Sequence, residues 1–124
     1  MNADKFTQKT IETIQTAQSM AQENGNQYLT PEHLLYALVD ADGGLIGTLL
    51  GRMGVDCNAV LSELDTAIDQ LPKVSGGSGE VYASPETSKI FNFAEREAKS
   101  GGDAYVSVEH LFAAARDVGE HIGL

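Results

Sequence analysis

Residues 28–37 read YLTPEHLLYA, and residues 105–114 read YVSVEHLFAA. The two stretches lie 77 positions apart, and the similarity extends well beyond them. When residues 7–47 are laid over residues 84–124 without gaps, ten positions are identical, against roughly two or three expected from ordinary composition. An internal repeat sets the architecture before any single motif is read. The identical pairs are Thr10/Thr87, Ala17/Ala94, Ala21/Ala98, Gly25/Gly102, Tyr28/Tyr105, Glu32/Glu109, His33/His110, Leu34/Leu111, Ala37/Ala114 and Asp40/Asp117.

Helical periodicity and helix start signals fill both copies of the repeat. Thr30 and Ser107 precede the helices of the duplicated stretch as N-caps, and Pro31 takes a first helical position. Ser84 and Pro85 make the same pairing at the start of the second copy. The apolar spacing predicts helices over residues 5–23, 31–41, 45–53, 56–71, 85–100 and 108–118, with another beginning at 122.

These elements together predict an all-α chain of two tandem, pseudo-symmetric four-helix repeats in one domain. The first repeat is predicted at residues 1–71, a flexible Gly/Ser-rich linker at 72–83, and the second repeat at 84–124. The second repeat is expected to be truncated, with an apolar surface left uncovered, because it lacks counterparts of residues 49–71. In the third helix, Leu49 and Leu50 are expected to be buried.

Charge and cysteine content limit the classes of partner. The formal net charge is −10, which argues against binding to nucleic acid or to an anionic membrane, since both need basic patches. A lone cysteine, Cys57, cannot form an internal disulfide, and residues 1–5 lead into a helical pattern without an apolar signal segment. We therefore expect a cytoplasmic protein.

The repeated Glu-His pair could suggest acid/base or metal chemistry, but a structural role is favoured. Glu32 and Glu109 stand in the first turn of their helices, where a carboxylate complements the helix dipole. His33 and His110 follow and can pack at helix contacts, and neither has a second His or Cys at ligand spacing. No Walker A motif or nucleophile elbow is present. The chain is therefore not expected to be an enzyme, and it is not expected to hold a metal or another cofactor.

Several motifs carry a resemblance to a known family. They are PEHL at residues 31–34, LPKV at 71–74 and GDAYVS at 102–107. With these motifs the sequence resembles the N-terminal double-repeat domain of the Clp/Hsp100 AAA+ unfoldases, over the whole chain. The join at 71–74 favours the ClpB-type disaggregase branch, whereas the doubled Glu-His-Leu is also similar to the ClpC-type branch.

The resemblance implies a role as a substrate-binding module. In the family, this domain captures unfolded or aggregated polypeptide and passes it to two AAA+ ATPase rings, which use ATP and Mg²⁺ in a hexamer. Those rings are absent from this chain. The implied partners are unfolded polypeptides, the protein's own rings and the DnaK chaperone system.

The resemblance also implies particular site residues. Thr7, Asp103 and Glu109 match polar positions linked to substrate handling, and Phe93 matches part of an apolar groove. Phe93 lies about 110° from the mean direction of the core face of its helix, so it could form an exposed patch or cover the edge of the core. Its groove partners in the family are apolar, whereas Glu97 and His110 are polar here.

Two alternatives stay open. In a ClpC- or ClpA-type domain that docks adaptors for a protease, Glu32 and Glu109 would bind phosphoarginine, because a carboxylate faces a guanidinium fork well. The other alternative is a free-standing helical stress scaffold without a motor.

Overall fold

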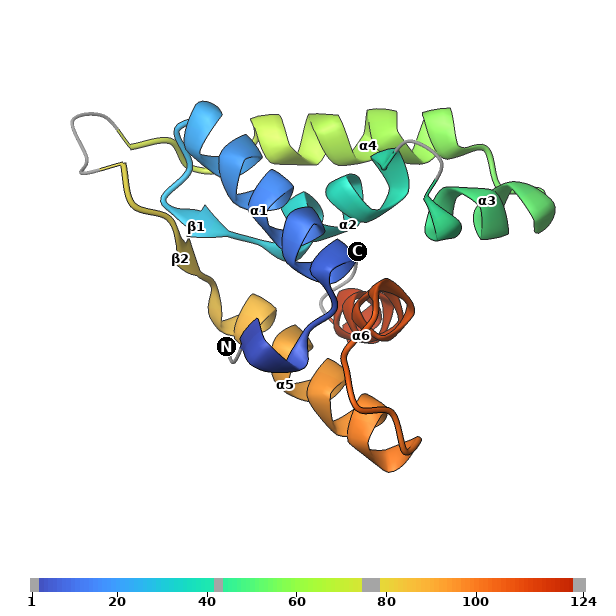
Figure 1. The fold of residues 1–124 in the computed structure, drawn as a ribbon. Helices are drawn as coiled ribbons and strands as arrows, with labels where there is room; N and C mark the ends of the chain where they lie inside the picture. Colours follow the sequence, from blue (N-terminus) through green and yellow to red (C-terminus); the bar gives the residue numbers. More distant parts are fainter. Residues whose placement is uncertain (1–2, 42–43, 75–78, 122–124) are drawn as a thin grey trace.

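The computed structural model describes residues 3–41, 44–74 and 79–121, and it consists of helices joined by short strands (Figure 1). The helices of the first repeat surround α2, and α5 and α6 pack against each other. In chain order the elements are η1 (Ala3–Lys5), α1 (Gln8–Glu23), β1 (Tyr28–Leu29), α2 (Pro31–Asp40), α3 (Leu45–Arg52), α4 (Cys57–Asp69), β2 (Tyr82–Ala83), α5 (Pro85–Ser100) and α6 (Val108–His121).

The first helix of each repeat begins directly after a residue whose side chain caps it. The side chain of Thr7 accepts a hydrogen bond from the Thr10 N–H, and the side chain of Ser84 accepts one from the Thr87 N–H. These two caps occupy equivalent positions in the repeat. Thr7 therefore caps the first helix, which begins at Gln8 rather than at residue 5 as the periodicity predicted. Residues 3–6 form the short 3₁₀ turn η1 and a bridged position at Phe6.

Two short parallel strand pairings join the repeats, and the sequence did not predict them. Leu29 pairs with Ala83 in β1 and β2, and Phe6 pairs with Val106 in an isolated bridge. The two pairings are related by the repeat, since Phe6 corresponds to Ala83 and Leu29 to Val106. The extended residues before the first helix of each repeat thus pair with the other repeat.

The segment 72–83, predicted as a flexible linker, is held by hydrogen bonds at both of its ends. The Val74 N–H donates to the Gly25 carbonyl at 2.9 Å, and the Tyr82 N–H donates to the Gln27 carbonyl at 3.0 Å. Residues 75–78 lie outside the described residues. The domain boundaries at 71 and 84 stay a prediction, because the two repeats share one core.

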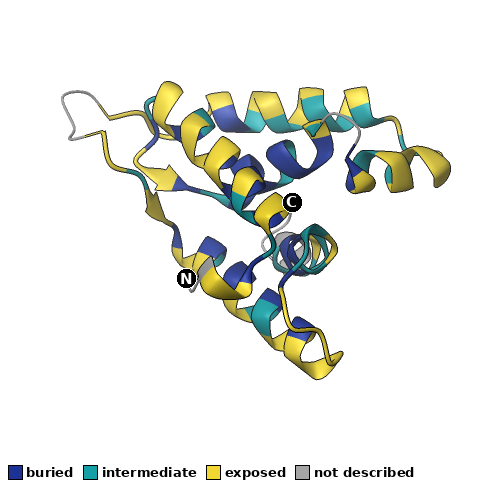
Figure 2. Cartoon of the chain, in the orientation of Figure 1, coloured by how far each residue is buried: buried dark blue, intermediate teal, exposed yellow. Residues whose placement is uncertain are grey.

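That core runs across both repeats. Phe6 of the first repeat meets Phe91 of α5 with ring centroids 6.1 Å apart, and the buried faces of α1, α2 and α5 turn toward the interior (Figure 2). The largest side chains that are almost fully buried come from both halves of the chain, and they include Leu29, Leu34, Leu38, Ile90, Leu111 and Val106.

One expectation about the core is wrong. Leu49 was predicted to be buried, but it is exposed on α3, and Ile46 takes the buried position instead. Because α3 has only eight residues, it covers the core with one narrow face. Leu50 is half-buried and lines an apolar groove with Leu35 of α2 and Phe112 of α6. The further helix predicted from residue 122 falls outside the described residues.

The threonine pair Thr10 and Thr87 shows why the repeat keeps these residues. Both are completely buried, and each hydroxyl crosses to the other repeat: Thr10 donates to the Val106 carbonyl at 3.0 Å, and Thr87 donates to the Leu29 carbonyl at 2.7 Å. These bonds fix the first helix of each repeat to the strand of the other.

Substituting these threonines should therefore weaken the whole domain. We expect Thr10→Val and Thr87→Val each to lower the free energy of unfolding by about 1–2 kcal/mol, because the variants keep side-chain shape and lose a buried hydrogen bond. Urea denaturation measures the loss. Thr16→Val is the matched control, because its exposed hydroxyl bonds only within α1, to the Glu12 carbonyl. An equal loss in the control would contradict a special role for the crossing bonds.

Candidate functional site

The start of α1 and the loop between α5 and α6 form one surface. The Thr7 N–H donates to the Val106 carbonyl at 3.1 Å, so the α1 cap lies beside the loop that carries Asp103. Glu109, exposed in the first turn of α6, follows at the other end of this loop. The structure thus brings three of the four predicted polypeptide-binding residues, Thr7, Asp103 and Glu109, onto neighbouring segments.

Phe93 is placed differently. It is half-buried and packs against the core cluster, and the guanidinium of Arg96 lies 5.9 Å from the centroid of its ring. Of the two readings that the sequence left open, this geometry favours a ring that covers the edge of the core. An Arg stacked on an aromatic ring gains a cation–π contact, which also occupies part of the ring surface.

His110 organises the α5–α6 loop. The Ser107 N–H donates to its Nδ1 at 3.0 Å, and the Ser107 hydroxyl lies at the same distance. Because Nδ1 accepts a hydrogen bond, the ring proton lies on Nε2, which donates it to Asp103 Oδ2 at 3.0 Å. The carboxylate therefore orients the imidazole, and the imidazole closes the cap of α6.

The first repeat builds the same arrangement in its interior. The Thr30 N–H donates to His33 Nδ1 at 3.0 Å, and His33 Nε2 lies 3.0 Å from Asn26 Oδ1. Asn26 is the repeat counterpart of Asp103. His33 is completely buried, and burial lowers its pKa to about 4. The sequence predicted a histidine packed at a helix contact, and in the structure both of its ring nitrogens are also bonded.

Burial is the main difference between the two copies. The side chains of His110 and Asp103 are 21% and 57% exposed, whereas His33 and Asn26 are buried. A carboxylate is tolerated in the second copy because water reaches it, and an amide serves in the first because an unpaired charge could not be buried there. The open copy is therefore the one suited to bind a ligand.

The two glutamates of the repeat also differ. Glu109 is exposed, whereas Glu32 is only 8% exposed, and burial raises its pKa, with a smaller rise from nearby Glu86 and an opposing hydrogen bond with Thr30. Of the two positions predicted for phosphoarginine, Glu109 alone presents its carboxylate to solvent.

Sequence reasoning missed the exposed apolar and aromatic residues. Tyr28 and Tyr82 pair across β1 and β2, and Tyr105 lies beside the bridge at Val106; all three rings are about half exposed. Met53 at the end of α3 is 74% exposed. Alternation could not have found Tyr28 and Tyr105, because each forms only a two-residue pattern with the buried residue that follows it.

Within residues 3–41, 44–74 and 79–121, no group of three or more His, Cys, Asp or Glu residues could hold a metal ion. Over the same residues, no single helix is long and apolar enough to cross a membrane. The bent pair of α2 and α3 passes that test by length and composition only, and most of α2 is buried in the core.

These features define a two-repeat helical module whose histidine-centred helix caps are buried in one copy and exposed to solvent in the other. The family model of the Clp repeat N-terminal domain matches residues 5–123, and the chain belongs to this family. Among curated relatives, the chaperone protein ClpB of Brucella suis biovar 1 (strain 1330) is 43% identical over 114 residues. This match covers 92% of the chain and 13% of the relative, so the chain spans about an eighth of the length of that relative.

Solved structures show the same fold. The N-terminal domain of Hsp104 from Candida albicans has a TM-score of 0.81 at 21% identity, covering 96% of this chain and 82% of that one. The N-terminal domain of the ClpV1 ATPase from E. coli also has a TM-score of 0.81 at 21% identity, covering 90% and 67%. At this identity the likeness concerns the fold alone.

Proposed function

We propose that this chain is the substrate-binding N-terminal domain of a ClpB-type disaggregase. It captures unfolded or aggregated polypeptide for threading by ATPase rings that lie outside the chain. The proposal extends to a cytoplasmic, hexameric full-length protein that uses ATP and Mg²⁺ and cooperates with the DnaK system. Membership of the Clp repeat family and the 43% identity to a ClpB chaperone support it.

One structural observation carries the proposal: the second copy of the cap is exposed to solvent. Asp103 and Glu109 present carboxylates at the two ends of an exposed loop, next to the Thr7 cap. An extended polypeptide offers backbone N–H groups and cationic side chains, and carboxylates bind both through charge-assisted hydrogen bonds. The exposed Tyr105 ring supplies apolar contact area in the same loop.

The test is an NMR titration with an unfolded model polypeptide. We expect shifts at Thr7, Asp103, Tyr105 and Glu109, and a loss of affinity of up to about five-fold in Glu109→Gln, because an exposed charged contact contributes about 0.2–1 kcal/mol. Glu12→Gln, which changes an exposed carboxylate on α1, is the matched control. Shifts confined to other surfaces would contradict the proposed site.

A second arm with free phosphoarginine tests the ClpC-type alternative. The exposure of Glu109 favours this reading at one position, and the burial of Glu32 opposes it at the other. Saturable shifts around Glu109 with phosphoarginine, absent in Glu109→Gln, would support docking of marked proteins instead.

A further inference from the structure

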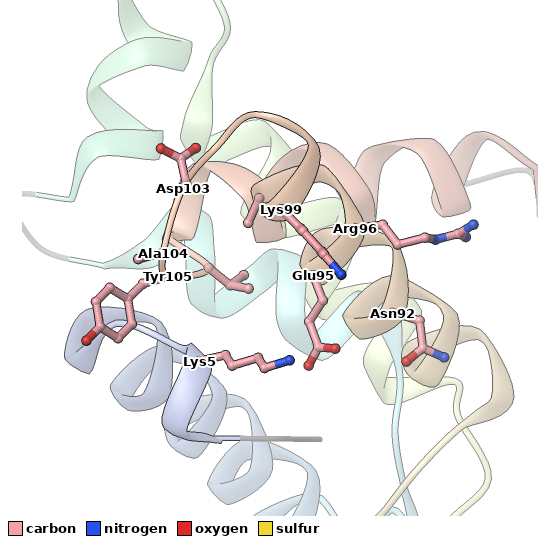
Figure 3. A pocket seen from close by; sticks show the side chains of 10 residues that line it. Lys5, Asn92, Glu95, Arg96, Lys99, Asp103, Ala104 and Tyr105 are labelled. Carbon is pink, nitrogen blue, oxygen red and sulfur yellow. The ribbon is translucent and has the colours of Figure 1, made fainter.

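A cleft of about 680 Å³ lies between η1, α5 and the α5–α6 loop (Figure 3). Its floor is apolar, because Ala98 and Val106 are almost completely buried. Lys5 reaches in from η1, and Lys99 and Glu95 extend from α5. Tyr105, which is 56% exposed, borders the cleft from the loop.

Backbone hydrogen bonds fix both walls of this cleft. The Val106 N–H donates to the Lys5 carbonyl at 2.7 Å, and the Asp103 N–H donates to the Ala98 carbonyl at 2.8 Å. The segments that carry the charged side chains therefore need no rearrangement on binding, which lowers the entropic cost of association.

The charges in the cleft leave two lysines available. Asp103 is bonded to His110, and its side chain points away from Lys5 and Glu95. Arg96 lies over the Phe93 ring. No ion pair within 4.0 Å joins Lys5 or Lys99 to another described residue. The residues that line the cleft carry three cationic groups, on Lys5, Arg96 and Lys99, against the two carboxylates of Glu95 and Asp103, so the cleft keeps a positive excess in a chain of net negative charge.

The other repeat shows that the fold does not require these charges. The counterparts of Lys5 and Lys99 are Tyr82 and Gln22, and the counterpart of Glu95 is Gln18. The same strand pairing and helix are built there without one charged side chain at these positions. The lysines of the cleft are thus not needed to hold the scaffold together, and a binding role explains them better.

We propose that this cleft binds the carboxylate of an isolated Asp or Glu side chain in a captured polypeptide. This inference rests on the proposed function, since it names the kind of segment that the domain prefers. Lys5 and Lys99 approach the carboxylate from opposite walls, and Tyr105 covers the neighbouring residue of the segment. A run of acidic residues is disfavoured, because the chain as a whole carries a net charge of −10.

The test uses three seven-residue peptides, acetylated and amidated so that the side chain is the only charge. Their central residue is Glu, Gln or Lys, and their flanking residues are neutral. We expect the Glu peptide to bind the full chain about five-fold more tightly than the Gln peptide in an NMR titration, with shifts at Lys5, Lys99 and Tyr105. The Lys peptide can bind the carboxylates of Asp103 and Glu109, but it should not shift Lys5 and Lys99.

The double variant Lys5→Gln with Lys99→Gln should abolish the preference for Glu and leave the affinity for the Gln peptide unchanged. Lys9→Gln with Lys89→Gln is the matched control, because both lysines are exposed on α1 and α5 outside the cleft. A preference that survives in the cleft variant, or equal binding of the Glu and Gln peptides to the unmodified chain, would overturn the proposal.

A parallel titration with the unfolded model polypeptide separates this proposal from the proposed function. If that polypeptide binds and no peptide preference is found, carboxylate selection is wrong and polypeptide capture stands. If neither the polypeptide nor any peptide binds, both are wrong.

Discussion

Replacing His33 by alanine is expected to lower the free energy of unfolding by about 4 kcal/mol, whereas His110→Ala should cost about 1 kcal/mol. The two residues occupy the same place in the repeat and make the same bonds through Nδ1 and Nε2. His33→Ala opens a buried cavity and removes the partner of the Thr30 N–H. In His110→Ala, water can replace the imidazole, because the site is open.

The loss at His33 should also spread to α4. Asn26, which bonds to His33, donates from Nδ2 to the Pro72 carbonyl at 3.2 Å, and Asn24 donates to the Ile68 carbonyl at the same distance. The buried network therefore holds the end of α4 to the start of α2. Hydrogen exchange should show faster opening at the end of α4 in His33→Ala and no change there in His110→Ala. Equal destabilisation by the two substitutions in urea would contradict this account.

The contrast between these histidines shows where sequence reasoning stops. Periodicity and capping signals predicted the helices and their starts, because both are local properties. The family was implied separately, by the resemblance of the motifs at 31–34, 71–74 and 102–107. The burial of His33 and the exposure of His110 depend on which residues from other segments pack against the start of each helix. Glu32 faces Glu86, for example, whereas the repeat counterpart of Glu86 is Lys9. A local pattern that is identical in both copies cannot reveal such a difference.

The sequence did not predict the strand pairings between the two repeats, for a related reason. β1 and β2 have two residues each, too few for an alternating pattern to stand out. The Gly/Ser-rich composition of the segment before β2 predicted a linker, and the repeat offset did not reveal that Phe6 and Ala83 pair with the opposite copy. The sequence left open whether Phe93 is exposed or covers the edge of the core, because its contact with Arg96 depends on three-dimensional packing.

Acid should destabilise the domain through His33. Burial lowers the pKa of His33 to about 4, whereas an unfolded histidine titrates near 6.5. Between these two pKa values the imidazole is protonated in the unfolded chain but not in the folded chain, so the free energy of unfolding falls as the pH falls. We expect this residue alone to cost about 2 kcal/mol by pH 5 and about 3 kcal/mol by pH 4, relative to pH 7.5. Urea denaturation at a series of pH values measures the slope.

Glu32 works in the opposite direction, and this sets the range in which His33 can be isolated. Burial raises the pKa of Glu32 above that of the unfolded chain, so the folded chain binds a proton at this carboxylate more readily. The free energy of unfolding therefore increases as the pH falls from the raised pKa of the folded chain to the ordinary pKa of the unfolded chain. The interval from pH 7.5 to 6 depends least on carboxylates. His33→Gln, measured with sucrose present to keep the variant folded, should flatten the slope in that interval, and His110→Ala should retain it.

The ring nitrogens give a readout that does not depend on stability. In the folded chain, His33 Nδ1 accepts a hydrogen bond from the Thr30 N–H. A proton on Nδ1 would place the Nδ1–H and the Thr30 N–H, both donors, face to face with no acceptor between them. Nitrogen chemical shifts should therefore report a neutral His33 with its proton on Nε2 down to about pH 4. An imidazole that becomes charged near pH 6.5 without loss of the fold would contradict the buried network, and so would a slope that persists in His33→Gln.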